Sequence, residues 1–444
     1  MIAYSTLASV MPFLDNRRQS GHNRSHSDCD VCALCLTHRA RETGKGNEMS
    51  RISRRQFITG LACTGLCALC GGITSSCQPV RTGTSPTAQS KAAAPTATPA
   101  PASATPPAPF IHEALYYTAA GSQVRCDLCP RRCAIADGER GECGVRENRA
   151  GVLYSVVYGR ACAVHADPIE KKPFYHFLPG SQAFSLATAG CNLHCLYCQN
   201  WEISQQRPES LESTDLPPGA VIASAQLHHC PVIAYTYTEP TVYYEYMLDT
   251  ARLARSQKLR SVVISAGYIN QDPLRELCQA VDAIKIDFKG FDEGFYQRVC
   301  NGTLRPVLET MKTIHRAGVH LEIVTLVVPT LNDSVEGLRG LCRWIVDELG
   351  PDIPAHFSRF YPLYKLTELP MTPVETLEQA RDIALEEGIR YAYVGNVPGH
   401  TGDNTYCHKC GKTIILRQGY TILENHIVGG RCEFCGQAIP GIWQ

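Results

Sequence analysis

Three cysteines in the spacing C-x3-C-x2-C constrain this chain more than any other feature. Cys191, Cys195 and Cys198 directly follow an apolar run over residues 183–190. A [4Fe–4S] cube has four iron corners, which four cysteines normally ligate. Three ligands in one short loop can leave the fourth iron open to a substrate or a cofactor. The spacing therefore predicts a cluster that does chemistry as well as transfers an electron.

The same spacing occurs a second time, at Cys63, Cys67 and Cys70. This copy lies in an apolar stretch after Ser53-Arg54-Arg55, and a twin-arginine pair before a short hydrophobic run is typical of a Tat export signal. Signal segments are not part of the fold. We therefore interpret this copy as part of a signal and the copy at 191–198 as the cluster site.

The segments around this signal set the expected organisation of the N-terminal quarter. Met49 is the expected start, so residues 1–48 are untranslated or disordered, and residues 49–77 form a Tat-type signal or anchor with Cys77 open to lipidation. Residues 78–110 are rich in Pro, Ala and Thr and form a linker that cannot bury enough apolar surface to order itself. A membrane-associated or exported location is expected, with a cytoplasmic location as the alternative.

The composition favours metal chemistry. The chain has 42 basic and 42 acidic residues in 444, so its charge balance gives no indication of nucleic-acid binding. It also has 23 cysteines, most of them in tight groups, and such grouping in a long chain indicates metal sites rather than a disulfide framework.

From residue 183 onward, strand-like and helix-like patterns alternate, which predicts an α/β fold with parallel strands and outer helices. The expected strands are Ala183–Thr188, Val232–Tyr237, Ser261–Ser265, Ala283–Asp287, His320–Val327 and Ala355–Phe360, with a short one at Arg390–Val394. The expected helices are Val242–Arg255, Pro273–Ala280, Pro306–Ala317, Ser334–Glu348 and residues 374–388. We expect a cysteine-rich module over 111–180, this core over 181–400, and a terminal module over 401–444.

Polar residues follow the expected strands, at the end where a parallel β/α fold places its active site. Asp287 and Lys289 lie two apart on an extended segment and so point the same way, which predicts one charged pair in a catalytic or merely structural role. Glu239 can accept from an ammonium group or stabilise a helix N-terminus. Gly267 follows the third strand, and Asn396 lies in a loop after the last one.

Two further cysteine sets predict metal sites. Cys126, Cys129, Cys133 and Cys143 can close either a Zn²⁺ site or a second iron–sulfur cluster, and the sequence leaves both open. Cys407, Cys410, Cys432 and Cys435 form two C-x-x-C-Gly knuckles with strand-like segments between them, which predicts a zinc ribbon. Cys300 is one of several lone cysteines, expected to be a small buried hydrophobe.

The cluster motif, with Tyr197 before its last cysteine, resembles the radical SAM superfamily, in which the open iron binds S-adenosylmethionine (SAM). Residues 111–444 resemble the radical SAM enzyme of the AmmeMemoRadiSam system, related to pyruvate formate-lyase activating enzymes. The stretches that resemble it are Cys126–Cys133, Asp167–Gly180, Cys191–Asn200, Tyr235–Thr241, Val394–Gly399 and the terminal ribbon.

The resemblance implies an open (β/α)6 partial barrel, a [4Fe–4S] cluster, and SAM as a source of 5′-deoxyadenosyl radical for an unknown substrate. Tyr197, Glu239, Gly267, Asp287, Lys289 and Asn396 would contact SAM, although Tyr237-Thr238 replaces the glycines that usually precede the glutamate. Expected partners are a low-potential electron donor and proteins of the Memo and AMME-region families. Two alternatives remain open: a glycyl-radical enzyme activase, and a non-catalytic electron-transfer or scaffold protein.

Overall fold

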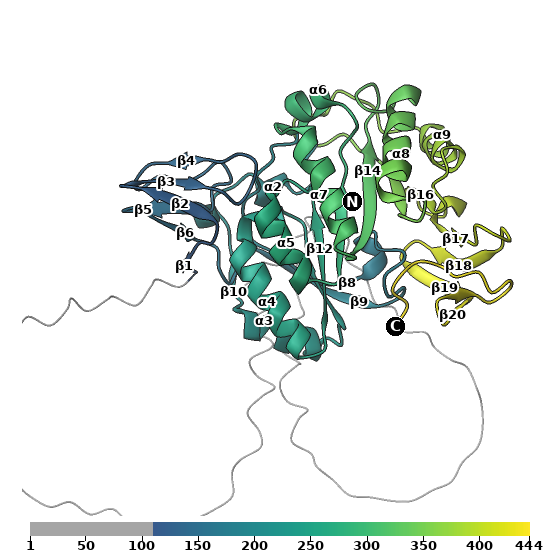
Figure 1. The fold of residues 1–444 in the computed structure, drawn as a ribbon, viewed down its shortest axis with the longest axis horizontal. Coiled ribbons are helices and arrows are strands. Elements are labelled where there is room, and N and C mark those ends of the chain that lie inside the picture. The colour runs from purple at the N-terminus through teal and green to yellow at the C-terminus, as the bar shows by residue number, and fades with distance from the viewer. Residues whose placement is uncertain (1–109) are drawn as a thin grey trace, which may run out of the picture. The chain divides into compact units, whose positions relative to one another are not determined.

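The computed structural model describes residues 110–444, and its centre is an open eight-stranded sheet (Figure 1). The strand order is β16-β15-β14-β13-β12-β11-β9-β8. Strands β9 to β16 are parallel, and β8 pairs antiparallel with β9 at one edge. The strands are β8 (Ala163–Pro168), β9 (Gln182–Ala187), β11 (Val232–Tyr235), β12 (Arg260–Ser265), β13 (Ala283–Asp287), β14 (His320–Val327), β15 (Ala355–Arg359) and β16 (Ala392–Gly395).

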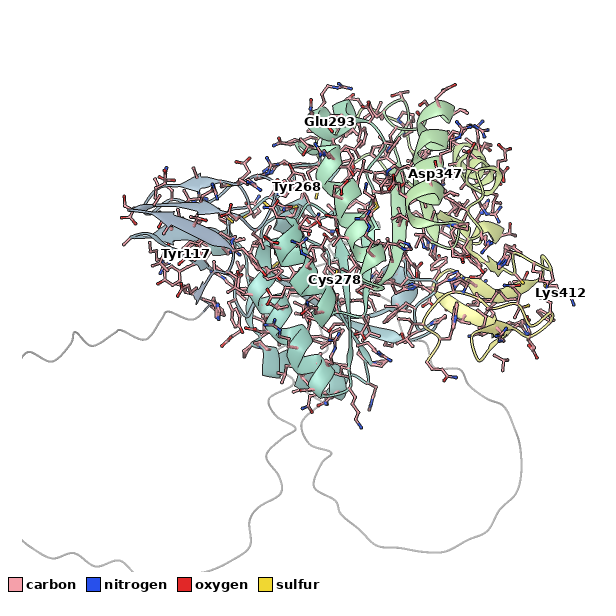
Figure 2. The ribbon with its side chains drawn as sticks, viewed as in Figure 1. Tyr117, Tyr268, Cys278, Glu293, Asp347 and Lys412 are labelled. Atoms are coloured by element: carbon pink, nitrogen blue, oxygen red, sulfur yellow. The ribbon has the colours of Figure 1, made fainter. Side chains whose placement is uncertain are left out.

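Helices follow most of the parallel strands and pack on one another in chain order, α3 on α4, α4 on α5, α5 on α7, α7 on α8 and α8 on α9. The α-helices are α2 (Trp201–Ser204), α3 (Pro218–Leu227), α4 (Tyr244–Ser256), α5 (Gln271–Ala280), α6 (Glu293–Phe295), α7 (Leu304–Arg316), α8 (Val335–Leu349) and α9 (Val374–Glu386). Figure 2 shows side chains filling this layer, with Cys278 on α5. Ser334 caps α8, since its Oγ accepts from the Gly337 amide at 3.1 Å.

The two faces of the sheet bury different side chains because successive residues of a strand point to opposite sides. Phe184, Ile233 and Val263 join the core beneath the helices. Ala183, Val232 and Val262 face the other way, into a second core that includes Phe174 and Phe177. The segment after β8 therefore covers the face of the sheet opposite the helices.

The two cysteine-rich modules are built from small antiparallel sheets. The N-terminal module contains β1 (His112–Glu113), β2 (Tyr117–Ala120), β3 (Gln123–Cys126), β4 (Ala134–Ile135), β5 (Arg146–Arg149), β6 (Val152–Ser155) and β7 (Arg160–Ala161), which pairs with β10 (Thr214–Asp215). The C-terminal module contains β17 (Thr405–Tyr406), β18 (Thr413–Gln418), β19 (Thr421–Asn425), β20 (Ile427–Val428) and β21 (Arg431–Cys432).

The α/β prediction is confirmed: the six main strands and five helices occur within a few residues of their predicted positions. The expected short strand at Arg390–Val394 joins the sheet as β16, making seven parallel strands rather than six. The edge strand β8 and helix α3 were not predicted, because neither has a strong amphipathic pattern. Within residues 110–444, no helix is long and apolar enough to cross a membrane. The signal, the linker and the Cys63–Cys70 motif lie outside the described residues.

Candidate active site

Cys191, Cys195 and Cys198 lie in the loop between β9 and α2, at the carboxyl end of the first parallel strand. Backbone hydrogen bonds tie this loop to the end of a short π-helix, Tyr296–Cys300. The amides of His194 and Leu196 donate to the carbonyls of Cys300 and Val299 at 3.0 and 2.9 Å. The loop is therefore held in place by protein contacts of its own, as a preformed cluster site requires.

The sulfurs of this loop receive hydrogen bonds from the protein. The Leu193 amide donates to Cys191 Sγ at 3.4 Å, and Ser204 Oγ lies 3.2 Å from Cys198 Sγ. Burial raises the pKa of both thiols, so they are neutral until a metal displaces their protons. Hydrogen bonds to cysteine sulfurs tune the potential of an iron–sulfur cluster, and this loop supplies them.

A fourth thiol lies beside the loop. Cys300 is fully buried, as predicted, but its thiol lies beside the loop, where its proximity is among the causes that raise the pKa of Cys195. The Tyr197 hydroxyl lies 3.5 Å from Cys300 Sγ, and its ring stacks on Phe295 at a centroid distance of 6.3 Å. The Tyr197 side chain thus packs within the protein, and its contact with SAM stays a prediction. Sequence reasoning missed the position of Cys300, because 103 residues separate it from Tyr197.

Asp287 and Lys289 form the predicted charged pair, with Lys289 Nζ 3.2 Å from Asp287 Oδ2. The structure adds Lys285, whose ammonium also contacts Asp287. Burial alone would raise the pKa of Asp287, but the two ammonium groups outweigh it and hold that pKa below its usual range. Burial acts the other way on Lys285 and lowers its pKa. The alternation of β13 places all three residues on one side of the strand.

Glu239 joins the ends of β11 and β12. Its Oε1 accepts from the Thr241 amide at 3.1 Å and from Ser265 Oγ at 2.7 Å, and its Oε2 accepts from the Ala266 amide at 2.8 Å. The structural role considered from the sequence is therefore present, since Glu239 caps the short helix Pro240–Tyr243. Binding of the SAM ammonium stays a prediction that this geometry allows, because a carboxylate oxygen has two lone pairs.

These charged groups share one neighbourhood with the cluster thiols. Burial raises the pKa of Cys191, and the negative charge of the nearby Glu239 carboxylate raises it further. The positive charge of the Lys289 ammonium has the opposite effect: it counteracts the rise in the pKa of Cys195 and of Cys198. The loop thus has a carboxylate near its first cysteine and an ammonium near the other two, which can pair with the two charged ends of an amino acid.

Gly267 and Asn396 both have left-handed backbone conformations, with φ of 72° and 62°. A Cβ at Gly267 would lie 3.3 to 3.4 Å from side-chain atoms of Ile286 and Thr310, so a side chain is disfavoured there on both counts. The Asn396 amide donates to the Arg359 carbonyl at 3.3 Å, which joins the ends of β15 and β16. The cofactor contacts of both residues stay predictions.

Comparison with known proteins identifies the family. Residues 185–342 match the family described as the Radical SAM superfamily, and this range contains all three loop cysteines. The chain contains a radical SAM domain. An uncharacterized protein of Methanocaldococcus jannaschii is 48% identical over 332 residues, which cover 74% of this chain and 99% of that relative. The family match supports an enzyme of the radical SAM class, and the ligand role of Cys191, Cys195 and Cys198 stays a prediction.

One more distant relative of this radical SAM enzyme and one solved structure bear activity names. The pyruvate formate-lyase-activating enzyme of Clostridium pasteurianum is 24% identical over 166 residues, covering 35% of this chain and 66% of the relative. Among solved structures, a radical SAM methyltransferase from Sphaerobacter thermophilus has a TM-score of 0.40 and 15% identity, covering 53% of this chain and 71% of that one. The radical SAM domain implies a [4Fe–4S] cluster and SAM.

The radical SAM enzyme has a second charged network, which sequence reasoning missed. Lys172 is fully buried, and its ammonium lies 2.5 Å from Asp167 Oδ2. Lys171 contacts the other oxygen of Asp167 at 2.8 Å, and the Tyr237 hydroxyl donates to Asp167 as well. Tyr237 follows β11, so this network adjoins the strand ends that hold Glu239. The Asp167–Gly180 stretch carries part of the family resemblance. No pattern in that stretch indicates that one of its lysines is buried.

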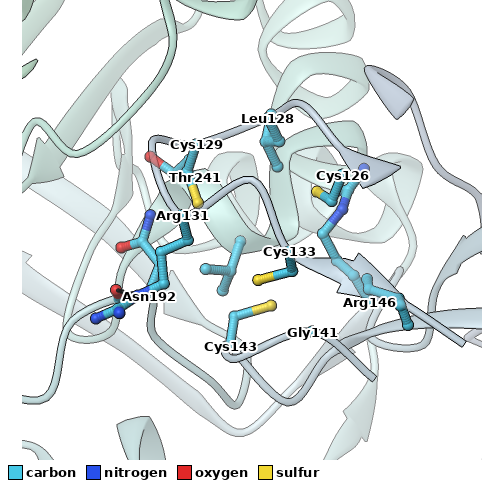
Figure 3. Close-up of a pocket in the computed structure, with 12 residues that line it drawn as sticks. Cys126, Leu128, Cys129, Arg131, Cys133, Gly141, Cys143, Arg146, Asn192 and Thr241 are labelled. Carbon is cyan, nitrogen blue, oxygen red and sulfur yellow. Dashed lines mark hydrogen bonds between the residues drawn. The ribbon is translucent and has the colours of Figure 1, made fainter. Parts of the chain in front are cut away.

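The four N-terminal cysteines of the enzyme surround one cavity, shown in Figure 3. They come from β3, from the turn between β3 and β4, and from the loop before β5. Burial raises the pKa of Cys129 to about 11 and that of Cys143 to about 12. The structure brings together all four residues that the spacing predicted, and their ligand role stays a prediction.

The four C-terminal cysteines lie much closer together, with all four sulfurs within 4.8 Å of one another. Cys407 Sγ lies 3.6 Å from Cys435 Sγ, and Cys410 Sγ lies 3.8 Å from Cys432 Sγ. Tetrahedral Zn²⁺ with bonds of about 2.3 Å places its sulfurs about 3.8 Å apart. This set is therefore preformed for a single tetrahedral ion.

Proposed function

We propose that this radical SAM enzyme cleaves SAM reductively on a [4Fe–4S] cluster held by Cys191, Cys195 and Cys198, and uses the product to abstract hydrogen from its substrate. The single observation that supports this most is the loop itself, which has three thiols near Glu239 and the Asp287–Lys289 pair, two of them hydrogen-bonded. When bound, the reduced cluster supplies one electron that splits SAM into methionine and a 5′-deoxyadenosyl radical.

In this proposal, charged side chains of the protein orient SAM, and buried side chains keep water away from it. Glu239, which accepts from the Ala266 amide, would also hold the SAM ammonium, and the Lys289 ammonium would attract the SAM carboxylate. Asp287 keeps the Lys289 side chain in place, since it contacts that ammonium at 3.2 Å. Buried Tyr197 and Phe295 close the loop on one side and exclude water from it.

The test is anaerobic incubation of the reconstituted enzyme with SAM and dithionite, followed by measurement of 5′-deoxyadenosine. We expect product from the native enzyme and from Cys278→Ser, a buried cysteine on α5 outside the three cysteine sets. Cys195→Ser should abolish product, and Lys289→Met should lower it by at least tenfold. Absence of 5′-deoxyadenosine from the native enzyme with a fully assembled cluster would overturn the proposal.

A glycyl-radical activase is a second candidate, favoured by the relatives named as activating enzymes. In that case the hydrogen comes from a backbone glycine of a protein substrate, and electron spin resonance after mixing with that protein would show a carbon-centred radical. The radical SAM domain sets aside the non-catalytic alternative.

The sequence resemblance also supports proposals on partners, metal and location. Proteins of the Memo and AMME-region families and a low-potential electron donor are the proposed partners, to be tested by co-purification of the tagged chain. Zinc is the proposed ion of the C-terminal set. The twin-arginine segment supports export or attachment to a membrane, which cell fractionation with and without Arg54→Lys and Arg55→Lys would test.

A further inference from the structure

We propose that Cys126, Cys129, Cys133 and Cys143 ligate a second [4Fe–4S] cluster, which passes single electrons to the catalytic cluster. The electron-transfer part rests on the proposed function, whereas the identity of the cluster does not. Four thiolates close all four corners of such a cube and leave no iron open. A closed cluster suits electron transfer rather than binding of SAM.

The spacing of the sulfurs separates this site from a zinc site. The C-terminal set gathers its sulfurs within 4.8 Å, the distance that one tetrahedral ion needs. Within residues 110–444, no other group of three or more Cys, His, Asp or Glu side chains brings its ligand atoms that close. The same chain thus contains a compact four-cysteine set and a wider one, and the wider one fits a larger group than a single ion.

The arrangement of the wider set agrees with this assignment. All four of its cysteines line one cavity, together with Leu128 and Ile135. Four thiolates on one Zn²⁺ would hold their sulfurs about 3.8 Å apart, and this set does not gather even three of its sulfurs within 4.8 Å. A cube of four irons and four sulfides fits the wider arrangement.

A buried donor on the cavity wall points to an anionic occupant. Arg146 lines the cavity and is 2% exposed, and its Nε–H has no hydrogen-bond partner in the described structure. Leaving such a buried donor unpaired is unfavourable. A cube with four thiolates is an anion whose sulfurs accept hydrogen bonds, so it would satisfy this donor.

The site also contacts the catalytic loop. Asn192, directly after the catalytic ligand Cys191, lines the same cavity. The Arg131 Nε donates to the Asn192 carbonyl at 2.7 Å, and Arg131, Asn192 and Cys129 all line this cavity. Because Asn192 is bonded to Cys191 and lines the cavity of the second site, the two clusters would be close neighbours.

The electron balance is simple. A low-potential one-electron donor reduces the second cluster from the 2+ to the 1+ state. That cluster then returns to 2+ as it reduces the catalytic cluster from 2+ to 1+. No bond forms or breaks in this step, and the catalytic cluster then holds the electron that SAM cleavage consumes.

The first experiment measures iron and zinc in the anaerobically purified full chain. We expect about eight iron atoms and about one zinc per chain. Cys126→Ser with Cys143→Ser should lower iron to about four and leave zinc unchanged, whereas the control Cys162→Ser with Cys278→Ser should keep about eight. About four irons with two zincs in the native chain would overturn the cluster, without need of any variant.

The second experiment tests the electron transfer. With a reduced flavodoxin as donor, the variant lacking the second cluster should form 5′-deoxyadenosine at least tenfold more slowly than the native enzyme. With dithionite, a small reductant that reaches the catalytic cluster directly, the two should differ by less than threefold. Equal rates with flavodoxin would overturn the transfer role. If neither donor yields 5′-deoxyadenosine from the native enzyme, the proposed function fails while the metal count still decides the cluster.

Discussion

Arg146 and Glu245 form a buried ion pair that joins the N-terminal module to helix α4. The Arg146 guanidinium donates to both carboxylate oxygens of Glu245, at 2.9 and 3.0 Å, and the side chains are 2% and 1% exposed. Both also bind the backbone of Leu115, whose amide donates to Glu245 at 2.7 Å. These bonds satisfy most of the polar groups of the buried pair, and the Arg146 Nε–H is the group that keeps no partner in the described structure.

Glu245→Ala should therefore lower the free energy of unfolding by about 3–5 kcal/mol, because it leaves the Arg146 charge buried without its partner. The matched control is Glu209→Ala, whose side chain is 53% exposed and pairs with Arg140. That change should cost less than about 1 kcal/mol. Anaerobic urea unfolding followed by circular dichroism measures both, and equal costs would contradict the structural role of the buried pair.

The sequence predicted what depends on local pattern. The strands, most of the helices and the three cysteine sets follow from alternation and spacing. The Asp287–Lys289 pair followed from two-residue periodicity, and the same rule would have added Lys285 had it been extended one step back along the strand.

Contacts between distant segments had no such local signal. Arg146 and Glu245 are 99 residues apart, and Lys172 meets Tyr237 across 65 residues. Which polar side chain is buried, and against what, depends on packing of elements that no single segment determines. The compactness of one four-cysteine set and the width of the other likewise became visible only in three dimensions.

Lys172 should give the stability of the enzyme a distinct pH dependence. Burial lowers the pKa of Lys172 to about 8, against the opposing effect of Asp167. Between about pH 8 and pH 10.5 the unfolded chain then binds more protons than the folded one, so this residue makes stability rise with pH. Lys172→Met should remove that rise. Lys171→Met, a 35% exposed neighbour on the same carboxylate, is the control and should retain it.

The measurement is the difference in unfolding free energy between the native enzyme and each variant, from urea titrations at several pH values. A native-minus-Lys172→Met difference that stays flat from pH 8 to pH 10 would show that Lys172 does not titrate in this window.

Cys300→Ala should test whether the neighbouring thiol is a ligand. We expect the variant to retain the iron of the catalytic site and to form 5′-deoxyadenosine, because three cysteines suffice to hold the cluster. The variant removes a polar S–H group beside the loop, 3.5 Å from the Tyr197 hydroxyl, and this loss should shift the reduction potential of the cluster to a more negative value. Potentiometry monitored by electron spin resonance measures the shift. Loss of iron together with activity would instead identify Cys300 as a fourth ligand.

Removal of the C-terminal metal should loosen the tail from the segment that covers the inner face of the sheet. Ile442 and Leu178 are joined by a backbone hydrogen bond of 2.7 Å, and the ring of Trp443 lies 5.3 Å from that of His176. We expect the C-terminal module to need the proposed zinc ion to keep these contacts, since metal binding supplies much of the folding energy of such small modules. Cys410→Ser with Cys432→Ser should therefore lower zinc from about one to near zero per chain and expose Trp443.

Trp443 fluorescence reports that exposure directly once the other two tryptophans are replaced, as Trp201→Phe and Trp344→Phe. In that background the cysteine variant should show red-shifted emission and faster quenching by acrylamide, as should chelator treatment of the parent. Cys230→Ser, which changes a buried cysteine outside the three sets, should leave both properties unchanged. Unaltered emission after complete loss of zinc would mean that packing against Leu178 and His176, rather than the metal, holds the tail in place.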